Sequence, residues 1–170
     1  MIVRFIIPCR NIEKNVSNLF DSLSCQTSDA WRCTVIDDMS EDDTQMTMLD
    51  YLMKNDMKKR VSFHHNYVRK HALKNVIEWS RPHQTGDDII AVIDGDDQLC
   101  NPKTVEMLID AYSAGNEIVW TAHKWDINGM NISKSMPSNV NPYQWPWSTS
   151  HLRTFKASLL KDVSDDNFKD

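Results

Sequence analysis

Short runs of apolar, β-favouring residues alternate along the chain with segments in which apolar residues recur every three or four positions. Runs of the first kind predict strands, and the helical spacing of the second kind predicts amphipathic helices. The first strand is expected at 3–8, and the helix after it, with Asn11 as N-cap, is expected to bury apolar residues between positions 12 and 23. Three further strands, each followed by a helix, are expected at 31–36, 60–66 and 89–94.

The second helix is expected to begin at a capping box formed by Ser40 and Asp43, where acidic residues favour the positive end of the helix dipole. Met46, Leu49 and Met53 then recur at helical spacing. These three residues are therefore predicted to form the stripe that this helix buries.

The last long helix is expected between Asn101, as its N-cap, and Gly115, which would end it. A fifth strand follows at 117–125, and Asn128-Gly129 is a strong signal for a two-residue hairpin turn. Beyond this turn the sequence is typical of a loop until a short strand near 152–155 and a short helix.

Strands that alternate with helices predict parallel pairing through right-handed crossovers. We therefore expect an α/β fold, a three-layer αβα sandwich with a mostly parallel central sheet, and a small antiparallel portion contributed by 117–132. Residues 1–170 are expected to form a single domain, and ligands bind such sheets beyond the carboxyl ends of the strands.

Composition narrows the possible partners. Apolar residues make up 41% of the chain and charged residues 25%, and the net charge of −5 argues against a nucleic-acid partner. No apolar run is long enough for a transmembrane segment, and the four cysteines lack the CxxC spacing of a zinc site or a disulfide framework. A cytoplasmic location is expected, with peripheral contact to a membrane left open.

The most informative stretch is IAVIDGDDQL, in which Asp94, Asp96 and Asp97 follow a buried strand. Like charges so close together repel one another, so a cation is expected to neutralise them. Asp37 and Asp38 similarly close the second strand, and the carboxyl ends of parallel strands meet at one edge of a sheet. The two acidic clusters are therefore predicted to share one site.

Several motifs in this order resemble the family 2 glycosyltransferases of the GT-A fold. They are the apolar strand with Pro-x-x-Asn in IIPCRN, the Gln-Thr of SCQTS, the strand ending in VIDDMS, and the Asp-x-Asp element of VIDGDD. HALKN is similar to the Ala-Arg-Asn that precedes this element in many members, and the likeness covers most of residues 1 to 125. The resemblance implies a nucleotide-diphospho-sugar transferase, in which residues 1–170 form the nucleotide-sugar-binding domain.

By this resemblance, Asp94 contacts the ribose of the donor, and Asp96, with Asp97, holds Mn²⁺ or Mg²⁺. Such an ion bridges carboxylate and diphosphate and stabilises the charge on the departing nucleoside diphosphate. The alternative, without a bound metal, is an acidic turn stabilised by the positive end of the next helix.

The resemblance assigns Asp38 to the N3–H of a uracil ring, with Pro8, Cys9 and Arg10 around the base. A carboxylate that accepts an imide proton distinguishes uracil from cytosine, whose N3 carries no hydrogen. Asp37 is as well suited to capping the next helix as to contacting the ligand.

The remaining site candidates are weaker. Arg69 and Lys74 are placed near the pyrophosphate, although a solvated helix face explains them equally well. Trp145, Trp147 and His151 are candidates for contacts with a saccharide, lipid or protein acceptor, and tryptophans more often serve packing.

An inverting transferase also needs a carboxylate base, which is expected beyond the fifth and sixth strands and past the end of this chain. Asp165 and Asp166 are the only candidates here, so the chain is expected to lack the region for the acceptor and the base. Two alternatives stay open: a nucleotide-sugar-binding module without turnover, and a nucleotidyltransferase. The second usually has a glycine-rich loop after the first strand, where this chain has PCRNIEKN.

Overall fold

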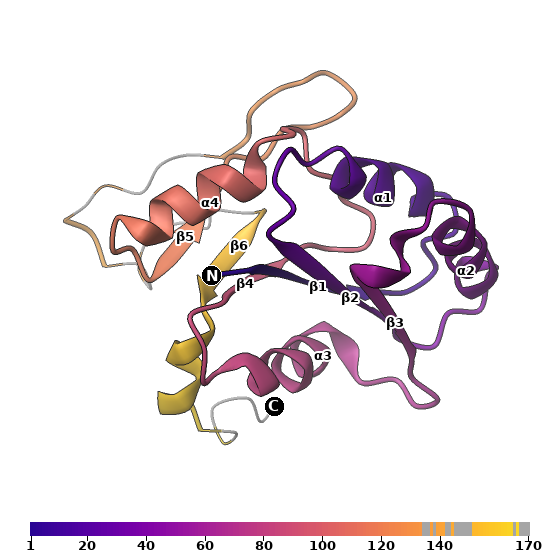
Figure 1. Ribbon diagram of the computed structural model, residues 1–170, viewed down its shortest axis with the longest axis horizontal. Coiled ribbons are helices and arrows are strands. Elements are labelled where there is room, and N and C mark those ends of the chain that lie inside the picture. Colours follow the sequence, from indigo (N-terminus) through magenta and orange to yellow (C-terminus); the bar gives the residue numbers. More distant parts are fainter. Residues whose placement is uncertain (134–136, 138, 142–143, 145–150, 165, 167–170) are drawn as a thin grey trace.

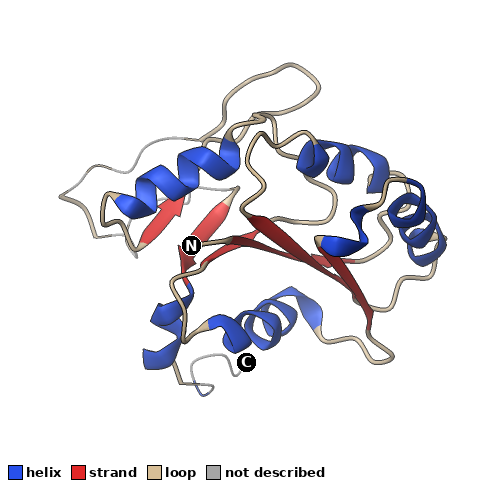
Figure 2. Ribbon diagram, viewed as in Figure 1, coloured by secondary structure: helices blue, strands red, loops and turns tan. Residues whose placement is uncertain are grey.

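A six-stranded sheet in the order β3-β2-β1-β4-β6-β5 forms the centre of the computed structural model, which describes residues 1–133, 137, 139–141, 144, 151–164 and 166 (Figures 1 and 2). The strands are β1 Val3–Cys9, β2 Trp31–Asp37, β3 Val61–His65, β4 Ile89–Val92, β5 Ile118–Trp120 and β6 Arg153–Lys156. The helices are α1 Val16–Ser24, α2 Thr44–Lys54, α3 His71–Ser80 and α4 Thr104–Ser113, with 3₁₀ helices η1 Met57–Lys59, η2 Arg81–His83 and η3 Ala157–Asp162. No helix in this part of the chain is long and apolar enough to cross a membrane.

Helices cover both faces of the sheet, as the alternation of strands and helices predicts (Figure 2). One core cluster joins α1, α2 and α4 to one face, and a smaller cluster joins α3 and η3 to the other. β1, β2, β3 and β4 pair in parallel, whereas β6 runs antiparallel to both β4 and β5. The expected three-layer α/β sandwich is therefore confirmed.

The register of the central strands brings their carboxyl ends to one edge. Pro8 of β1 pairs with Ile36 of β2, and Ile6 pairs with Val92 of β4. β1 and β4 are buried on both faces because helices cover the sheet on each side, which explains their nearly unbroken apolar sequences. The loops after β1, β2 and β4 consequently leave the sheet side by side.

The first helix begins later than the sequence predicts. α1 starts at Val16 with Asn15 in the N-cap position, and Asn11 instead has a left-handed backbone with φ of 55°. The side-chain oxygen of Asn11 accepts the N–H of Glu41 at 2.9 Å, so it joins two loops rather than capping a helix. This use depends on a partner about 30 residues away, which periodicity does not reveal.

The last long helix and the hairpin follow the prediction in part. Asn101 is not the N-cap that the sequence predicts, because α4 begins at Thr104 with Lys103 in the N-cap position; the carbonyl of Asn101 instead accepts the hydroxyl of Thr104 at 2.7 Å. Gly115, with φ of 98°, follows the end of the helix as predicted. A hairpin forms here, with an antiparallel bridge between Lys124 and Asn131, but its turn is longer than the two residues predicted. The N–H of Trp125 donates to the carbonyl of Met130 at 3.0 Å, which leaves the four residues 126–129 in the loop. β5 is shorter than expected, because only three of its predicted residues pair with β6.

The buried stripe predicted for the second helix is wrong. Met46 and Met53 are 70% and 68% exposed, whereas Met48 and Leu52 lie in the core. Thr44 begins the buried face, because its hydroxyl accepts the N–H of Ile12 at 2.8 Å and turns this side of α2 inward. A polar residue therefore sets the orientation, and a search for apolar periodicity passes over it.

The predicted capping box also does not form. Ser40 donates its hydroxyl to Asp37, and α2 begins at Thr44 with Asp43 in the N-cap position but without a capping hydrogen bond from its side chain. Asp42 instead accepts the N–H of Thr44 at 3.1 Å.

Met48→Ala should destabilise the protein by about 2–4 kcal/mol, because it removes a buried side chain and leaves a cavity. The matched variant Met46→Ala, two residues away on the same helix, should change the free energy of unfolding by less than about 0.5 kcal/mol. Urea denaturation of both variants would measure the difference. Equal losses would contradict the orientation of α2.

Candidate functional site

Three loops meet at the carboxyl edge of the sheet and hold one another in place. The N–H of Asn11, after β1, donates to the hydroxyl of Ser40, after β2, at 2.9 Å. The side-chain amide of Asn15 reaches the carbonyl of Asp96, after β4, at 3.3 Å. Each loop is thus fixed by contacts with another, as preorganised ligand sites require.

Gly95 allows the loop after β4 to press against the end of β1. A Cβ atom at this position would lie 2.4 Å from the Cβ of Cys9 and 3.2 Å from the side chain of Ile12. Real Cβ atoms do not approach so closely, so a larger residue would push the acidic loop away from β1. The glycine inside the acidic motif therefore sets the position of the neighbouring carboxylates.

A carboxylate and imidazole cluster lies at this edge. Asp94, Asp97 and His151 offer ligand atoms that all lie within 4.8 Å of one another. Nδ1 of His151 is 3.5 Å from Asp94 and 3.4 Å from Asp97, and the carbonyl of Asp94 accepts the N–H of Asp97 at 3.0 Å. The structure thus joins His151, predicted for the acceptor, to two of the acidic residues.

Asp96 lies outside this cluster. Its side chain is exposed, and its contact with the loop after β1 is made by its backbone carbonyl. The metal role assigned to Asp96 by resemblance stays a prediction, as does the contact of Asp94 with ribose.

Arg153 supplies positive charge at the cluster. Its Nη2 lies 3.2 Å and 3.4 Å from the two carboxylate oxygens of Asp94. Sequence reasoning missed this residue. The sequence did predict a strand at 152–155, which contains Arg153, but only the pairing of β6 with β4 brings this arginine to Asp94.

The cluster has excess negative charge despite this pair. Burial raises the pKa of Asp97, which lies above its ordinary value. His151 opposes the shift, whereas the carboxylates of Asp96 and Asp94 add to it. The ionised form of Asp97 is therefore disfavoured here, and an added cation would stabilise it.

His123, after β5, is a further residue that the sequence did not single out. Its ring centroid lies 4.7 Å from that of His151, in an edge-on arrangement. Its Nδ1 is buried and has no hydrogen-bond partner within the described residues, and the same is true of Nδ1 of His151. Two imidazole nitrogens without hydrogen bonds therefore border the acidic cluster.

Asp38 is buried at the end of β2 and is held by the start of α3. Its oxygens accept the backbone N–H groups of Lys70 and His71 at 2.9 and 2.7 Å and the amide of Asn66 at 2.8 Å. Burial by itself raises the pKa of Asp38, but hydrogen bonds from these groups and from Asn75 lower it to below its ordinary value. The carboxylate is therefore ionised and rigidly oriented.

Asp37 is fully buried and has structural partners of its own. It accepts the N–H of Ser40 at 3.1 Å as well as the Ser40 hydroxyl, and Nδ1 of His65 lies 2.8 Å away. These contacts shape the turn after β2. Asp37 does not cap α2, so that alternative is wrong, and its contact with a ligand stays a prediction.

The residues expected around the base differ in accessibility. Pro8 and Cys9 are buried, and burial raises the pKa of the Cys9 thiol far above its ordinary value, with Asp37 adding to the effect. Arg10 donates to Glu41 at 2.6 Å and to the carbonyl of Met39 at 3.2 Å, so it braces the loop after β2. Contact of these three residues with a base stays a prediction.

Other candidates lie away from these contacts. Arg69 and Lys74 are exposed, and neither forms an ion pair within the described ranges. Trp145, Trp147 and Asp165 lie outside the described residues. Asp166 is exposed, and its N–H donates to the Ser164 hydroxyl at 3.2 Å.

Comparison with known proteins points to one family. The sequence profile described as Glycosyl transferase family 2 matches residues 5–167. No curated protein matches the sequence closely enough to count as a relative. The fold is similar to that of S. aureus TarS, with a TM-score of 0.72 and 20% identity over 95% of this chain and 29% of that one.

Two other solved structures are similar. Mannosyltransferase PcManGT from Pyrobaculum calidifontis, in complex with GDP-Man and Mn²⁺, has a TM-score of 0.69 and 16% identity over 94% of this chain and 46% of that one. The synthase of 4-diphosphocytidyl-2C-methyl-D-erythritol has a TM-score of 0.60 and 13% identity over 98% of this chain and 82% of that one. These likenesses show the GT-A type of fold. Because the synthase shares this fold, the family of this chain is shown by the sequence profile and not by the fold.

Gly95→Ala should destabilise the protein and displace the acidic loop, because the added Cβ would overlap that of Cys9. We expect a loss of about 1–3 kcal/mol in the free energy of unfolding, measured with urea. Gly86→Ala is the matched control, since a Cβ there would meet nothing closer than 3.8 Å. An equally small effect of both substitutions would contradict the close approach.

Proposed function

The chain belongs to glycosyl transferase family 2, and we propose that it binds a UDP-sugar with a divalent metal ion and transfers the sugar, with inversion, to an acceptor hydroxyl. The observation that carries this proposal is the cluster of Asp94, Asp97 and His151 beside the loops after β1 and β2. A family 2 fold with a cluster suited to a cation at its ligand-binding edge has the parts that donor binding requires.

The residues of the cluster fit a metal ion. Two carboxylate oxygens and an imidazole nitrogen lie within 4.8 Å of one another, and Nδ1 of His151 lacks a hydrogen bond within the described residues. Mg²⁺ prefers oxygen ligands alone. Mn²⁺ also binds carboxylate oxygens, and it accepts an imidazole nitrogen more readily than Mg²⁺ does. We therefore propose Mn²⁺ at Asp94, Asp97 and His151, in place of the set of Asp96 and Asp97 implied by the family resemblance.

When bound, such an ion would neutralise negative charge on the diphosphate of the donor and so favour its departure. Arg153 is placed to add to this effect. Its guanidinium, which now lies against Asp94, would be released when an ion takes its place and could then hydrogen-bond a phosphate oxygen. We propose this exchange as the role of Arg153.

Asp38 supports the choice of uracil. Hydrogen bonds from Asn66, Lys70 and His71 hold the Asp38 carboxylate ionised and in a fixed orientation. An ionised carboxylate can only accept hydrogen bonds, which suits the single N3–H of uracil. Guanine would present two adjacent donors, and cytosine has no hydrogen at N3, so both match this carboxylate less well.

The spacing of the strands is consistent with a nucleoside diphosphate. β1 lies between β2 and β4, so the strand ends that precede Asp38 and Asp94 are about 10 Å apart. A base at Asp38 and a diphosphate at the metal cluster would therefore place the ribose over the end of β1. The buried Pro8 and Cys9 would form the floor beneath it.

The metal proposal predicts different behaviour for carboxylates in the same loop. Mn²⁺ with UDP should raise the melting temperature of the protein by several degrees, and Asp94→Asn, Asp97→Asn and His151→Gln should remove most of this rise. Asp96→Asn, the control with the same charge change, should retain it. Without metal, Asp97→Asn should itself raise the melting temperature by about 2–4 °C, because it relieves repulsion within the cluster.

Differential scanning fluorimetry with UDP, CDP and GDP, with and without Mn²⁺, would provide these measurements. Equal shifts for the three nucleotides, or shifts that do not depend on the metal, would refute the proposed donor. Loss of the metal response in Asp96→Asn alone would instead support the ligand set implied by the family resemblance.

Replacement of Arg153 should change metal and nucleotide binding in opposite directions. Arg153→Gln should strengthen binding of Mn²⁺ alone by up to about fivefold, because the ion no longer competes with an ion pair for Asp94. The same variant should weaken UDP binding in saturating Mn²⁺ by about tenfold, because a charged hydrogen-bond donor is lost.

Electron paramagnetic resonance of free Mn²⁺ and calorimetry with UDP would measure the two affinities. Lys156→Gln, on the same strand, is the control for loss of one positive charge and should change neither. If Arg153→Gln weakens both affinities, the arginine supports the fold of the site and does not exchange with the metal.

A further inference from the structure

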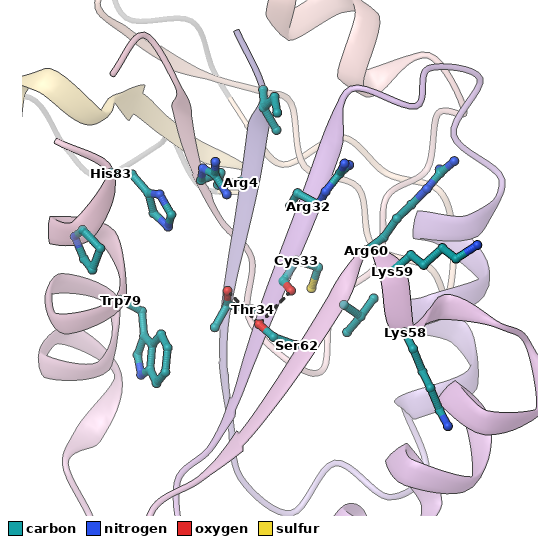
Figure 3. Close-up of a pocket in the computed structure, with 13 residues that line it drawn as sticks. Arg4, Arg32, Cys33, Thr34, Lys58, Lys59, Arg60, Ser62, Trp79 and His83 are labelled. Carbon is teal, nitrogen blue, oxygen red and sulfur yellow. Dashed lines mark hydrogen bonds between the residues drawn. The ribbon is translucent and has the colours of Figure 1, made fainter. Parts of the chain in front are cut away.

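A recess lies at the opposite end of the strands from the acidic cluster. It has a volume of about 470 Å³ and lies between the first halves of β1, β2 and β3 and the end of α3 with η2 (Figure 3). Arg4 and Arg32 are each the second residue of their strand, whereas the acidic cluster follows the carboxyl end of β4. The volume is within the range of about 300–1,000 Å³ that is typical of small-molecule sites.

Two arginines lie side by side in the wall of this recess. Arg4 of β1 and Arg32 of β2 are direct register partners, so their side chains leave the same face of the sheet next to each other. Like charges in such positions are destabilising unless an anion lies between them. Asp88 accepts Nε of Arg4 at 2.5 Å, which accounts for one of the two positive charges.

The second positive charge has no such partner. Arg32 donates to the carbonyl of Trp31 at 2.7 Å, and within the described residues it forms no ion pair. Among the described residues that line the recess there is no carboxylate, while Lys58 and Lys59 add positive charge at its rim. Arg60 does not count toward this charge, because its guanidinium binds Asp29 and lies over the Trp31 ring.

The rest of the wall is suited to a polar ligand with an organic body. Figure 3 shows the hydroxyls of Thr34 and Ser62 on the sheet, joined by a hydrogen bond of 3.2 Å, and Trp79 and His83 on the helical side. Burial lowers the pKa of His83, and the nearby charge of Arg4 lowers it further. An anion beside Arg4 would offset that charge.

The geometry points to a binding site for a phosphate monoester, with the phosphate between Arg4 and Arg32 and the rest of the ligand along Trp79. Arginine guanidinium groups bind phosphate with several charge-assisted hydrogen bonds, and Nη1 and Nη2 of Arg4 are not used by Asp88. The same group could come from a soluble metabolite or from a lipid headgroup. The site is separate from the proposed donor site, because it lies near the amino ends of the strands, whereas the acidic cluster lies at their carboxyl ends.

Thermal unfolding without divalent metal would test this inference. The melting temperature should rise in sodium phosphate and in glucose 6-phosphate, compared with sodium chloride at equal ionic strength. A parallel flotation assay would compare vesicles of phosphatidylcholine with and without phosphatidic acid. A response to the soluble probes or to phosphatidic acid identifies the source of the phosphate group.

Two substitutions at one position sharpen the test. Arg32→Gln should weaken phosphate binding by about tenfold, because it removes a charged donor. Arg32→Glu should abolish binding and raise the melting temperature in chloride, because glutamate would pair with Arg4 across the two strands. Lys103→Gln, which removes an exposed charge at the start of α4, should bind phosphate like the wild type.

Arg32→Glu should retain the response to Mn²⁺ with UDP, so the outcome does not depend on the proposed donor site. The inference is overturned if the wild type responds to none of the phosphate probes beyond the chloride control. It is also overturned if Lys103→Gln loses as much affinity as Arg32→Gln, or if Arg32→Glu binds phosphate as the wild type does.

Discussion

Hydrogen bonds to the carboxylates buried at the carboxyl ends of the strands determine much of the geometry of this protein. Asp37 and Asp38 are 0% and 5% exposed, and an uncompensated charge at that depth would be strongly destabilising. The turn at Ser40 and the ring of His65 compensate Asp37, and the start of α3 compensates Asp38. The path of the chain from β2 to α3 is therefore fixed by the need to hydrogen-bond two negative charges.

The acidic residues after β4 differ from this pair in a way that matters for function. Backbone N–H groups satisfy Asp38, whereas Asp94 and Asp97 face an arginine and an imidazole at distances of 3.2–3.5 Å. In the loop after β2, protein hydrogen bonds fully stabilise the buried carboxylate, whereas in the loop after β4 they do so only in part. Carboxylates that the fold itself does not satisfy are those that remain available to a cation.

The sequence predicts the strands well and the details of the helices less well, for a physical reason. A strand buried on both faces, such as β4, is apolar throughout and can be recognised from composition alone. The orientation of α2 depends on the hydrogen bond that Ile12, in the loop before α1, donates to the hydroxyl of Thr44. The start of α1 depends on the hydrogen bond that the side chain of Asn11 accepts from Glu41. Such long-range polar contacts leave no periodic signal in the sequence.

The distinction between sequence neighbours and residues brought together by long-range contacts also applies to the sites at the two ends of the strands. The acidic edge could be predicted because its carboxylates are adjacent in sequence, whereas His151, His123 and Arg153 reach it only through the antiparallel pairing of β6 with β4 and β5. Arg4 and Arg32 are likewise joined only by strand register. α3 spans the two edges: its start binds a carboxylate and its last turn borders the arginines. Since a helix is positive at its start, α3 stabilises the carboxylate of Asp38 there.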